Sequence, residues 1–117
     1  MCELDVYVKR FDSNAKVASE IIYAGAEGGA LVLRDIVGST TKLEDTIISG
    51  IDINHERMEL TESPLLSSVV KFIETYENCL SKGEYASDLQ DRWDVVKDRG
   101  DQMVRALWAR SEKVKAH

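Results

Sequence analysis

The sequence predicts an α+β protein in which a small antiparallel β-barrel or roll, SH3-like or similar, is followed by a C-terminal αα-hairpin. Over the first sixty residues, short runs alternate apolar and polar side chains, which is typical of half-buried strands. Beyond Leu60, apolar side chains recur every three or four positions, which is typical of amphipathic helices. We therefore expect two domains, a β-barrel over residues 1–61 and a helical hairpin over residues 62–117.

The composition narrows the possible functions. With 117 residues, 44% of them hydrophobic, the chain can build a packed core. A net charge of −6 disfavours binding to phosphate backbones, so nucleic acid is not an expected partner. No apolar run is long enough to span a bilayer, no secretory signal precedes the first strand, and the two cysteines are too far apart to indicate a disulfide framework. We expect a soluble, cytoplasmic protein.

Six segments are expected to form strands, because apolar and β-branched residues alternate in them or form short runs between turn formers. They are residues 2–8, 17–23, 30–36, 42–44, 47–53 and 57–60. Asp12-Ser13-Asn14 and Asn54-His55 are the expected turns. Gly25 and Gly28-Gly29 are expected to end the second strand, and Gly50 predicts a bulge. Short, closely spaced strands favour a sheet that curls to remove its open edges.

Ser63-Pro64 is the expected start of the first helix, since serine accepts an N–H group at the N-cap and proline suits the first helical position. The helix is expected to end near Lys82, because Gly83 suits the left-handed position that follows a helix. Its expected apolar face consists of Leu66, Val69, Val70, Ile73, Tyr76 and Leu80. Cys79 lies beside this face, and we expect it to serve in packing.

The second helix is expected to start at Ser87-Asp88-Leu89-Gln90, which has the form of a capping box. Apolar residues of this helix keep heptad spacing, and they are Leu89, Trp93, Val96, Met103 and Leu107. Gly100 alone interrupts this seam, and we expect a close helix approach or a weak point there. Val104 and Trp108 broaden the stripe beyond what one partner helix covers. Two arrangements remain open: the hairpins of two subunits pack together, or the stripe folds back on its own β domain.

The first two residues, Met1-Cys2, offer three metal donors in one short chelating stretch: the α-amino nitrogen, the amide nitrogen between them and the Cys2 thiolate. Consecutive donors of this kind close five-membered rings, and the planar nitrogen–sulfur field that results suits Ni(II) or Cu(II) better than tetrahedral Zn(II). If processing removes Met1, Cys2 keeps an amine–thiolate pair of similar preference. The alternative interpretation is that a cysteine falls at the second position of an apolar strand by chance.

Three elements in this order resemble the CooT family of small nickel-binding proteins: the Met-Cys start, the stretch Leu33-Arg34-Asp35-Ile36-Val37-Gly38, and the closing stretch from Gly50 to Leu60. The resemblance covers residues 1–60. It implies a homodimer that binds Ni(II) through the N-terminal cysteines of its subunits and is linked to nickel supply for carbon monoxide dehydrogenase. Of the family's positions, only the metal-binding one is carried over, to Cys2 and the terminal amine of Met1.

The expected function is that of a nickel metallochaperone or store, because a C2 interface brings Cys2 of both chains together and completes a square-planar site. The alternative is a protein-docking or RNA-associated adaptor with no metal role. His55 is expected to be a turn or surface residue rather than a ligand, and His117 a fraying end. The sequence shows no nucleophile–base arrangement and no clustered pair of acids, so an enzyme is not expected.

Overall fold

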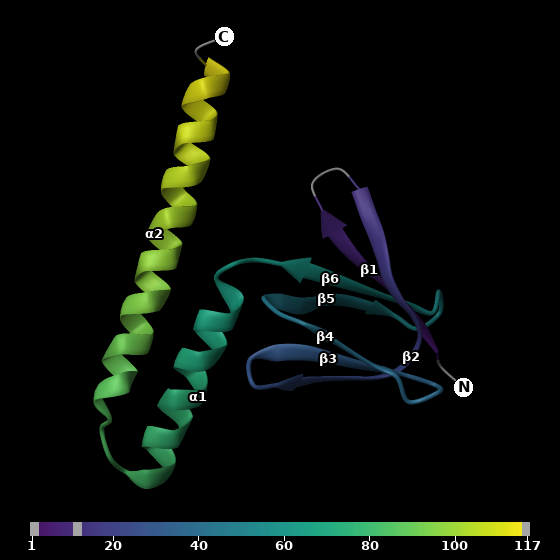
Figure 1. Ribbon diagram of the computed structural model, residues 1–117, viewed down its shortest axis with the longest axis horizontal. Helices are drawn as coiled ribbons and strands as arrows, with labels where there is room; N and C mark the ends of the chain where they lie inside the picture. Colours follow the sequence, from purple (N-terminus) through teal and green to yellow (C-terminus); the bar gives the residue numbers. More distant parts are fainter. Residues whose placement is uncertain (1–2, 11–12, 116–117) are drawn as a thin grey trace. The chain divides into compact units, whose positions relative to one another are not determined.

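The computed structural model describes residues 3–10 and 13–115, with side chains over residues 3–9 and 13–112 (Figure 1). The chain divides into two compact units, Met1–Ser67 and Ser68–His117. The first unit holds six strands: β1 (Leu4–Arg10), β2 (Ser13–Glu27), β3 (Ala30–Asp35), β4 (Thr40–Leu43), β5 (Thr46–Asp52) and β6 (Arg57–Glu62). The helices that follow are α1 (Leu66–Lys82) and α2 (Ser87–Lys115), which confirms the expected α+β class. In the described residues, neither helix is long and apolar enough to cross a bilayer.

The six strands form one mixed sheet in the order β4-β3-β2-β1-β6-β5. Four of the five neighbouring pairs are antiparallel, as expected, whereas β1 and β6 run parallel, with Asp5 opposite Arg57 and Lys9 opposite Thr61. The expectation of a purely antiparallel sheet is wrong at this pair. Parallel neighbours need a long connection, and here the four intervening strands provide it.

A two-residue link forces the sheet to curl. The two edge strands, β4 and β5, are consecutive in the chain and are separated by Glu44 and Asp45 alone. Leu43 and Thr46 can therefore lie at most about 11 Å apart, whereas the edges of a flat six-stranded sheet lie about 24 Å apart. The sheet bends into a half-barrel until its edges meet at the link, which confirms the expected roll.

β2 is the long strand that joins the two halves of the curl. It has 15 residues, and it pairs with β1 up to Ile21 and with β3 from Ile21 onward. At this change of partner, Glu20 has a φ of 57°, in the left-handed region. The strand continues through Gly25, so the expected break there is wrong. Gly28 and Gly29, which both have positive φ, end the strand as expected.

The bulge and the turn expected near β5 are both confirmed. The register between β5 and β6 shifts between Ile48 and Gly50. The Ser49 hydroxyl donates to the Glu59 carbonyl at 3.1 Å across this shift. Residues 53–56 form the turn that joins β5 to β6. This turn sets the position at which β6 begins, and therefore its alignment with β1.

The inner face of the curl is the hydrophobic core of the first unit. Successive side chains of a strand point to opposite faces, so alternate residues of the central strands enter this core. Seven side chains that are at most 6% exposed form it: Val6, Val8, Ile21, Leu31, Leu33, Met58 and Leu60. Because β1 lies between β2 and β6 and sends Val6 and Val8 into the core, its position is fixed from three sides.

α1 begins two residues later than the Ser63-Pro64 signal predicts. The Ser63 hydroxyl accepts a hydrogen bond from the Leu65 N–H at 3.3 Å, and the first helical residue is Leu66. The carboxylate of Asp45 takes the role of the cap, because it accepts the Ser67 N–H at 2.9 Å. The Asp45 carbonyl also accepts the Ser63 N–H at 2.9 Å. The link that closes the sheet therefore also holds the start of α1.

α1 and α2 form the expected hairpin. Gly83, with a φ of 67°, ends α1 as expected, and α2 begins at Ser87 itself. Phe72 contacts Trp93, with ring centroids 5.4 Å apart. Three members of the expected apolar face of α1 are exposed instead, and they are Ile73, Tyr76 and Leu80. The face of α1 that contacts α2 is therefore displaced around the helix axis by about one residue from the predicted face. A full turn of the helix takes 3.6 residues.

Truncation of a core side chain should destabilise the first unit strongly. Leu33→Ala removes a side chain with 0% exposure and should lower the free energy of unfolding by about 2–5 kcal/mol. Ile47→Ala, the matched control, removes a side chain that is 50% exposed and should cost about 1 kcal/mol or less. Urea titrations followed by the NMR amide signals of the strands measure both values, and equal losses would contradict the assigned core.

Candidate functional site

The start of β1 is fixed in the sheet on both sides. Leu4 lies opposite Ile21 of β2, and Asp5 lies opposite Arg57 of β6. The Asp5 N–H also donates to the carbonyl of Glu56 at 2.9 Å. The first residues of β1 therefore have a set position at one end of the sheet.

The predicted metal ligands, Met1 and Cys2, lie outside the described residues. In the sequence, Cys2 precedes Leu4, the first residue of β1, by two positions. Among the residues that the structure does describe, no group of three or more His, Cys, Asp and Glu side chains could hold a metal ion. The site at Met1 and Cys2 stays a prediction, and the described part of the chain offers no competing site.

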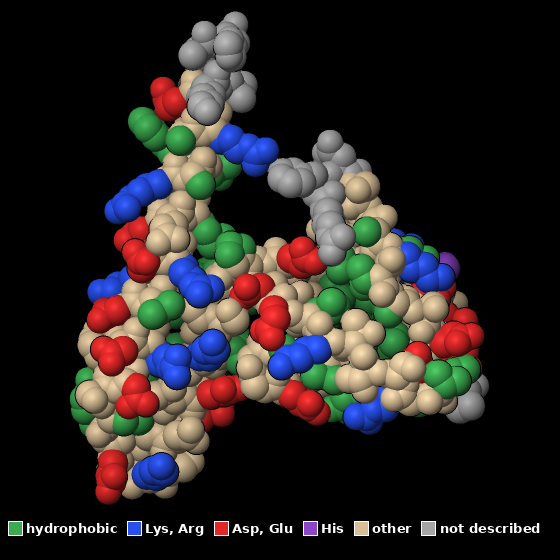
Figure 2. Space-filling view, in the orientation of Figure 1, with side chains coloured by type: hydrophobic (Ala, Val, Ile, Leu, Met, Phe, Trp, Pro, Cys, Tyr) green, Lys and Arg blue, Asp and Glu red, His purple; other side chains and the backbone are tan. Residues whose placement is uncertain are grey.

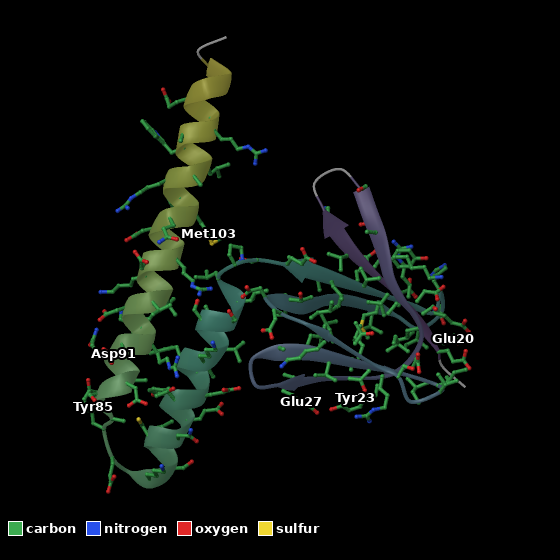
Figure 3. The ribbon with its side chains drawn as sticks, viewed as in Figure 1. Glu20, Tyr23, Glu27, Tyr85, Asp91 and Met103 are labelled. Atoms are coloured by element: carbon green, nitrogen blue, oxygen red, sulfur yellow. The ribbon has the colours of Figure 1, made fainter. Side chains whose placement is uncertain are left out.

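Acidic side chains lie at the end of the sheet where β1 starts. Glu3 precedes β1 and is half-buried, while Glu56, in the turn before β6, is exposed. Glu20 lies at the bend of β2 (Figure 3), and its carbonyl accepts a hydrogen bond from the Ile36 N–H at 3.1 Å. Three carboxylates at one end of the sheet favour the approach of a cation, over a range of about 8 Å at physiological salt.

Contacts on both flanks reinforce the position of β1. The guanidinium of Arg57 lies over the ring of Tyr7, with its central carbon 3.9 Å from the ring centroid. On the other flank, Lys16 of β2 and Asp5 form an ion pair at 3.4 Å. These groups are partly exposed, so each contact contributes about 1 kcal/mol or less. Together they favour a single register of β1 between its neighbours.

His55 lies in the turn between β5 and β6, as expected, but sequence reasoning missed its partner. The His55 N–H donates to Asp52 Oδ1 at 3.2 Å, and its ring Nδ1 lies 2.7 Å from Asp52 Oδ2. These hydrogen bonds lower the pKa of Asp52 below its ordinary value. The pair braces the turn that precedes β6. The Asp-x-x-His spacing across an expected turn is the signal that could have predicted it.

Cys79 is the cysteine that the structure describes. It is half-buried on α1 and borders a hollow of about 210 Å³ lined mainly by polar residues of α1, of the turn after it and of the first turn of α2. No histidine or second cysteine lines this hollow. Its position agrees with a packing role better than with metal binding.

The fold and the fixed position of β1 define a class of protein. It is a small curled-sheet module with its amino-terminal strand at the centre, extended by a helical hairpin. The sequence model of the family described as "CO dehydrogenase accessory protein CooT" matches residues 1–61. The protein belongs to this CooT family, which confirms the resemblance found in the sequence. An accessory protein of CO dehydrogenase is not itself an enzyme, so the expectation of no enzymatic activity is confirmed as well.

Among solved structures, the chain is similar to a crystallised protein from Carboxydothermus hydrogenoformans that is provisionally assigned to CooT. The two are 16% identical, with a TM-score of 0.49, and the match covers 53% of this chain and 98% of that one. No curated protein matches the chain. Residues 62–117, which include α1 and α2, lie outside the family match.

Removal of the His55 imidazole should raise the pKa of Asp52 towards 3.8, the ordinary value for this carboxyl, because the hydrogen bond to the imidazole is the largest cause of the lowering, while the backbone N–H groups at positions 54 and 55 continue to lower it. Because the folded-state pKa is lowered, the pair stabilises the protein above the ordinary pKa, and that stabilisation is lost as the pH falls through the folded-state pKa. Carboxyl ¹³C NMR across the acid range compares His55→Ala with wild type. Asn54→Ala, which keeps the imidazole, should leave the pKa of Asp52 low. An equally low pKa in His55→Ala would show that the imidazole is not the cause.

Proposed function

We propose that the protein binds Ni(II) and serves carbon monoxide dehydrogenase, a nickel-containing enzyme, as a cytoplasmic nickel metallochaperone or store. The observation that carries this proposal is the family match over residues 1–61, which begins at the Met1-Cys2 pair itself. The description of the family names CO dehydrogenase, which is the proposed client enzyme. The nitrogen and thiolate donors at the amino terminus are the reason for proposing Ni(II) as the metal.

The proposed ligands are the α-amino nitrogen of Met1, the amide nitrogen between Met1 and Cys2, and the Cys2 thiolate. Nitrogen and thiolate donors suit Ni(II) in a planar field. A second copy, related by a two-fold axis, can supply the same groups from the other side, because a C2 axis brings identical residues together. The protein is a homodimer in this proposal, and the metal is shared between its two amino termini.

The described part of the chain supports the proposal through β1. Leu4 and Asp5 pair with neighbouring strands on both sides, so the two residues proposed as ligands lead directly into a rigid element. Ligands attached to a rigid strand lose less freedom on binding a metal than ligands on a loose tail. The carboxylates of Glu3, Glu20 and Glu56 at the same end of the sheet add attraction for a divalent cation.

A second candidate function is that of a docking adaptor, and the helical unit favours it. Residues 62–117 lie outside the family match, and α2 exposes several large apolar side chains. Such a surface suits a protein partner better than RNA, because the net charge of the chain is −6. The two functions are compatible, since the sheet could carry nickel while the helices contact a partner.

Cys2→Ser should abolish tight nickel binding, because a serine hydroxyl does not replace a thiolate as a ligand for Ni(II). Titration calorimetry of the untagged protein should give one Ni(II) per two chains for wild type and no tight binding for the variant. Cys79→Ser, which removes the other thiol, should bind like wild type. Unchanged binding by Cys2→Ser would refute the metal role and leave the docking adaptor.

Nickel affinity should rise with pH between about 6 and 9, since a thiol with a pKa of about 8.5 and an amine with a pKa of about 8 must both lose a proton. At pH 7 this deprotonation costs about 3 kcal/mol per chain. An extra residue placed before Met1 converts the amine into an amide, and it should weaken binding and alter the pH dependence. Affinity that stays constant over this range would be inconsistent with the proposed ligands.

A further inference from the structure

α1 carries two lines of side chains at heptad spacing, and α2 covers one of them. In the inner line, Phe72 contacts Trp93 of α2, and Thr75 and Cys79 border the hollow that reaches the first turn of α2. The other line also keeps steps of three and four positions, and it consists of Leu66, Val69, Ile73, Tyr76 and Leu80. We call it the outer seam. Its last three members are 46%, 49% and 65% exposed, so α2 leaves the larger apolar side chains uncovered.

The outer seam lies on a different side of α1 from the contact with α2. With about 100° of rotation per residue, its centre lies about 110° around the helix from the centre of the inner line. The side of α1 opposite the outer seam is polar and exposed, with Lys71, Asn78 and Lys82 on it. Figure 2 shows basic and acidic side chains on the face of the two helices that is turned to the viewer. A partner on the outer seam therefore leaves the packing of α1 on α2 unchanged.

The spacing of the outer seam indicates what kind of surface covers it. A helix that packs on a globular core carries a broad apolar stripe, whereas a narrow line at steps of three and four is typical of helix-on-helix packing. Val70 widens the seam at its first turn, and beyond it the exposed residues Glu74, Glu77 and Ser81 border the seam. The described residues hold two helices, and α2 already packs on the inner line. The helix that fits the outer seam therefore belongs to another molecule.

The outer seam matches a second copy of itself in antiparallel orientation. A two-fold axis between Glu74 and Thr75 sets Val69 of one copy opposite Leu80 of the other, and it sets Ile73 opposite Tyr76. Each layer then joins a smaller side chain to a larger one. A parallel pair would instead place the two Tyr76 rings in one layer.

The charges of α1 also permit two copies to meet. Lys71 and Lys82 balance Glu74 and Glu77, so the helix has no net charge although the whole chain carries −6. Two copies therefore avoid strong like-charge repulsion along this helix. An antiparallel pair also sets the positive end of each helix dipole beside the negative end of the other.

An apolar hollow continues the outer seam toward α2. The hollow has a volume of about 450 Å³ and is lined by Phe72, Tyr85, Leu89, Gln90 and Trp93. The Phe72 ring stacks on Tyr76 of the seam, with ring centroids 6.4 Å apart. A helix on the outer seam can therefore contact α2 as well, as each helix of a four-helix bundle contacts two neighbours. A continuous apolar surface of this kind is typical of a protein interface.

From these observations we infer that two copies of this chain associate through the outer seams of α1, in antiparallel orientation, so that two hairpins form a four-helix bundle. The contact involves only the helical unit. It goes beyond the proposed nickel site and does not depend on it, because neither Met1 nor Cys2 takes part.

Sedimentation velocity of the full chain, with a chelator present, tests this association. Wild type and Cys2→Ser should both be dimeric, since no metal is needed. Leu80→Glu buries an unpaired charge in the seam and should weaken dimerisation at least about tenfold. The matched control is Leu107→Glu, the same change at a side chain of α2 that is 68% exposed and lies outside the seam, and it should leave the dimer intact.

Circular dichroism should show the same helix content in wild type and in both variants, because both leucines are exposed in the single chain. A monomeric wild type would overturn the association. So would a Leu80→Glu variant that dimerises normally, or a Leu107→Glu variant that dimerises as weakly as Leu80→Glu.

Disulfide cross-linking tests the orientation of the pair without a charged substitution. Val69→Cys and Leu80→Cys are made separately in a chain that carries Cys2→Ser and Cys79→Ser, and the two proteins are mixed with oxidised glutathione. The antiparallel pair should give mainly the dimer that joins position 69 of one chain to position 80 of the other. Dimers of 69 with 69 and of 80 with 80 would indicate a parallel pair and would overturn the proposal, as would the absence of any cross-link.

Nickel titration of Leu80→Glu separates this inference from the proposed function. Loss of the helical contact with nickel binding retained through Cys2 would support both, with the metal able to join two chains by itself. A wild-type dimer that binds no nickel would refute the nickel site and leave the helical association supported. A wild type that is monomeric without metal and dimeric with it would refute the helical association and support the nickel site.

Discussion

The two-residue link between β4 and β5 is the constraint on which the rest of the structure depends. Glu44 and Asp45 must join strands that occupy opposite edges of a six-stranded sheet, and two residues cannot cross a flat one. The sheet therefore curls, and its inner face becomes the place where the core assembles. β1 runs through the middle of this curl, so the amino-terminal strand is among the most constrained parts of the molecule.

Periodicity predicted which segments form strands and helices, because an element that buries one face needs apolar residues at the positions that point to that face. It could not predict that β1 and β6 run parallel, since the alternation is the same for both directions of pairing. Gly25 shows a second limit. Glycine weakens an isolated strand, but here β3 pairs with β2 along this stretch, and the Tyr23 side chain occupies the space where a Cβ of Gly25 would lie.

At the start of α1 and at the candidate site, too, some features follow from the local sequence and others only from tertiary contacts. Ser63 carries a local capping signal, whereas the carboxylate that caps α1 belongs to Asp45, 22 residues before Ser67. The metal-binding potential of Met1-Cys2 follows from donor chemistry and family resemblance, which need no folded chain. The hydrogen bond from Asp5 to Glu56 exists only because two strands distant in the sequence meet, so no local pattern could predict it.

Asp45 serves two structural purposes at once. It takes a left-handed φ of 52° in the link between the edge strands, and it accepts hydrogen bonds from Ser63 at its carbonyl and from Ser67 at its carboxylate. Local unfolding of the sheet edge must break the bonds that hold the first helical turn, and fraying of that turn must release the edge. We therefore expect the two regions to open as one cooperative unit, with their amide hydrogens protected from exchange to a similar degree.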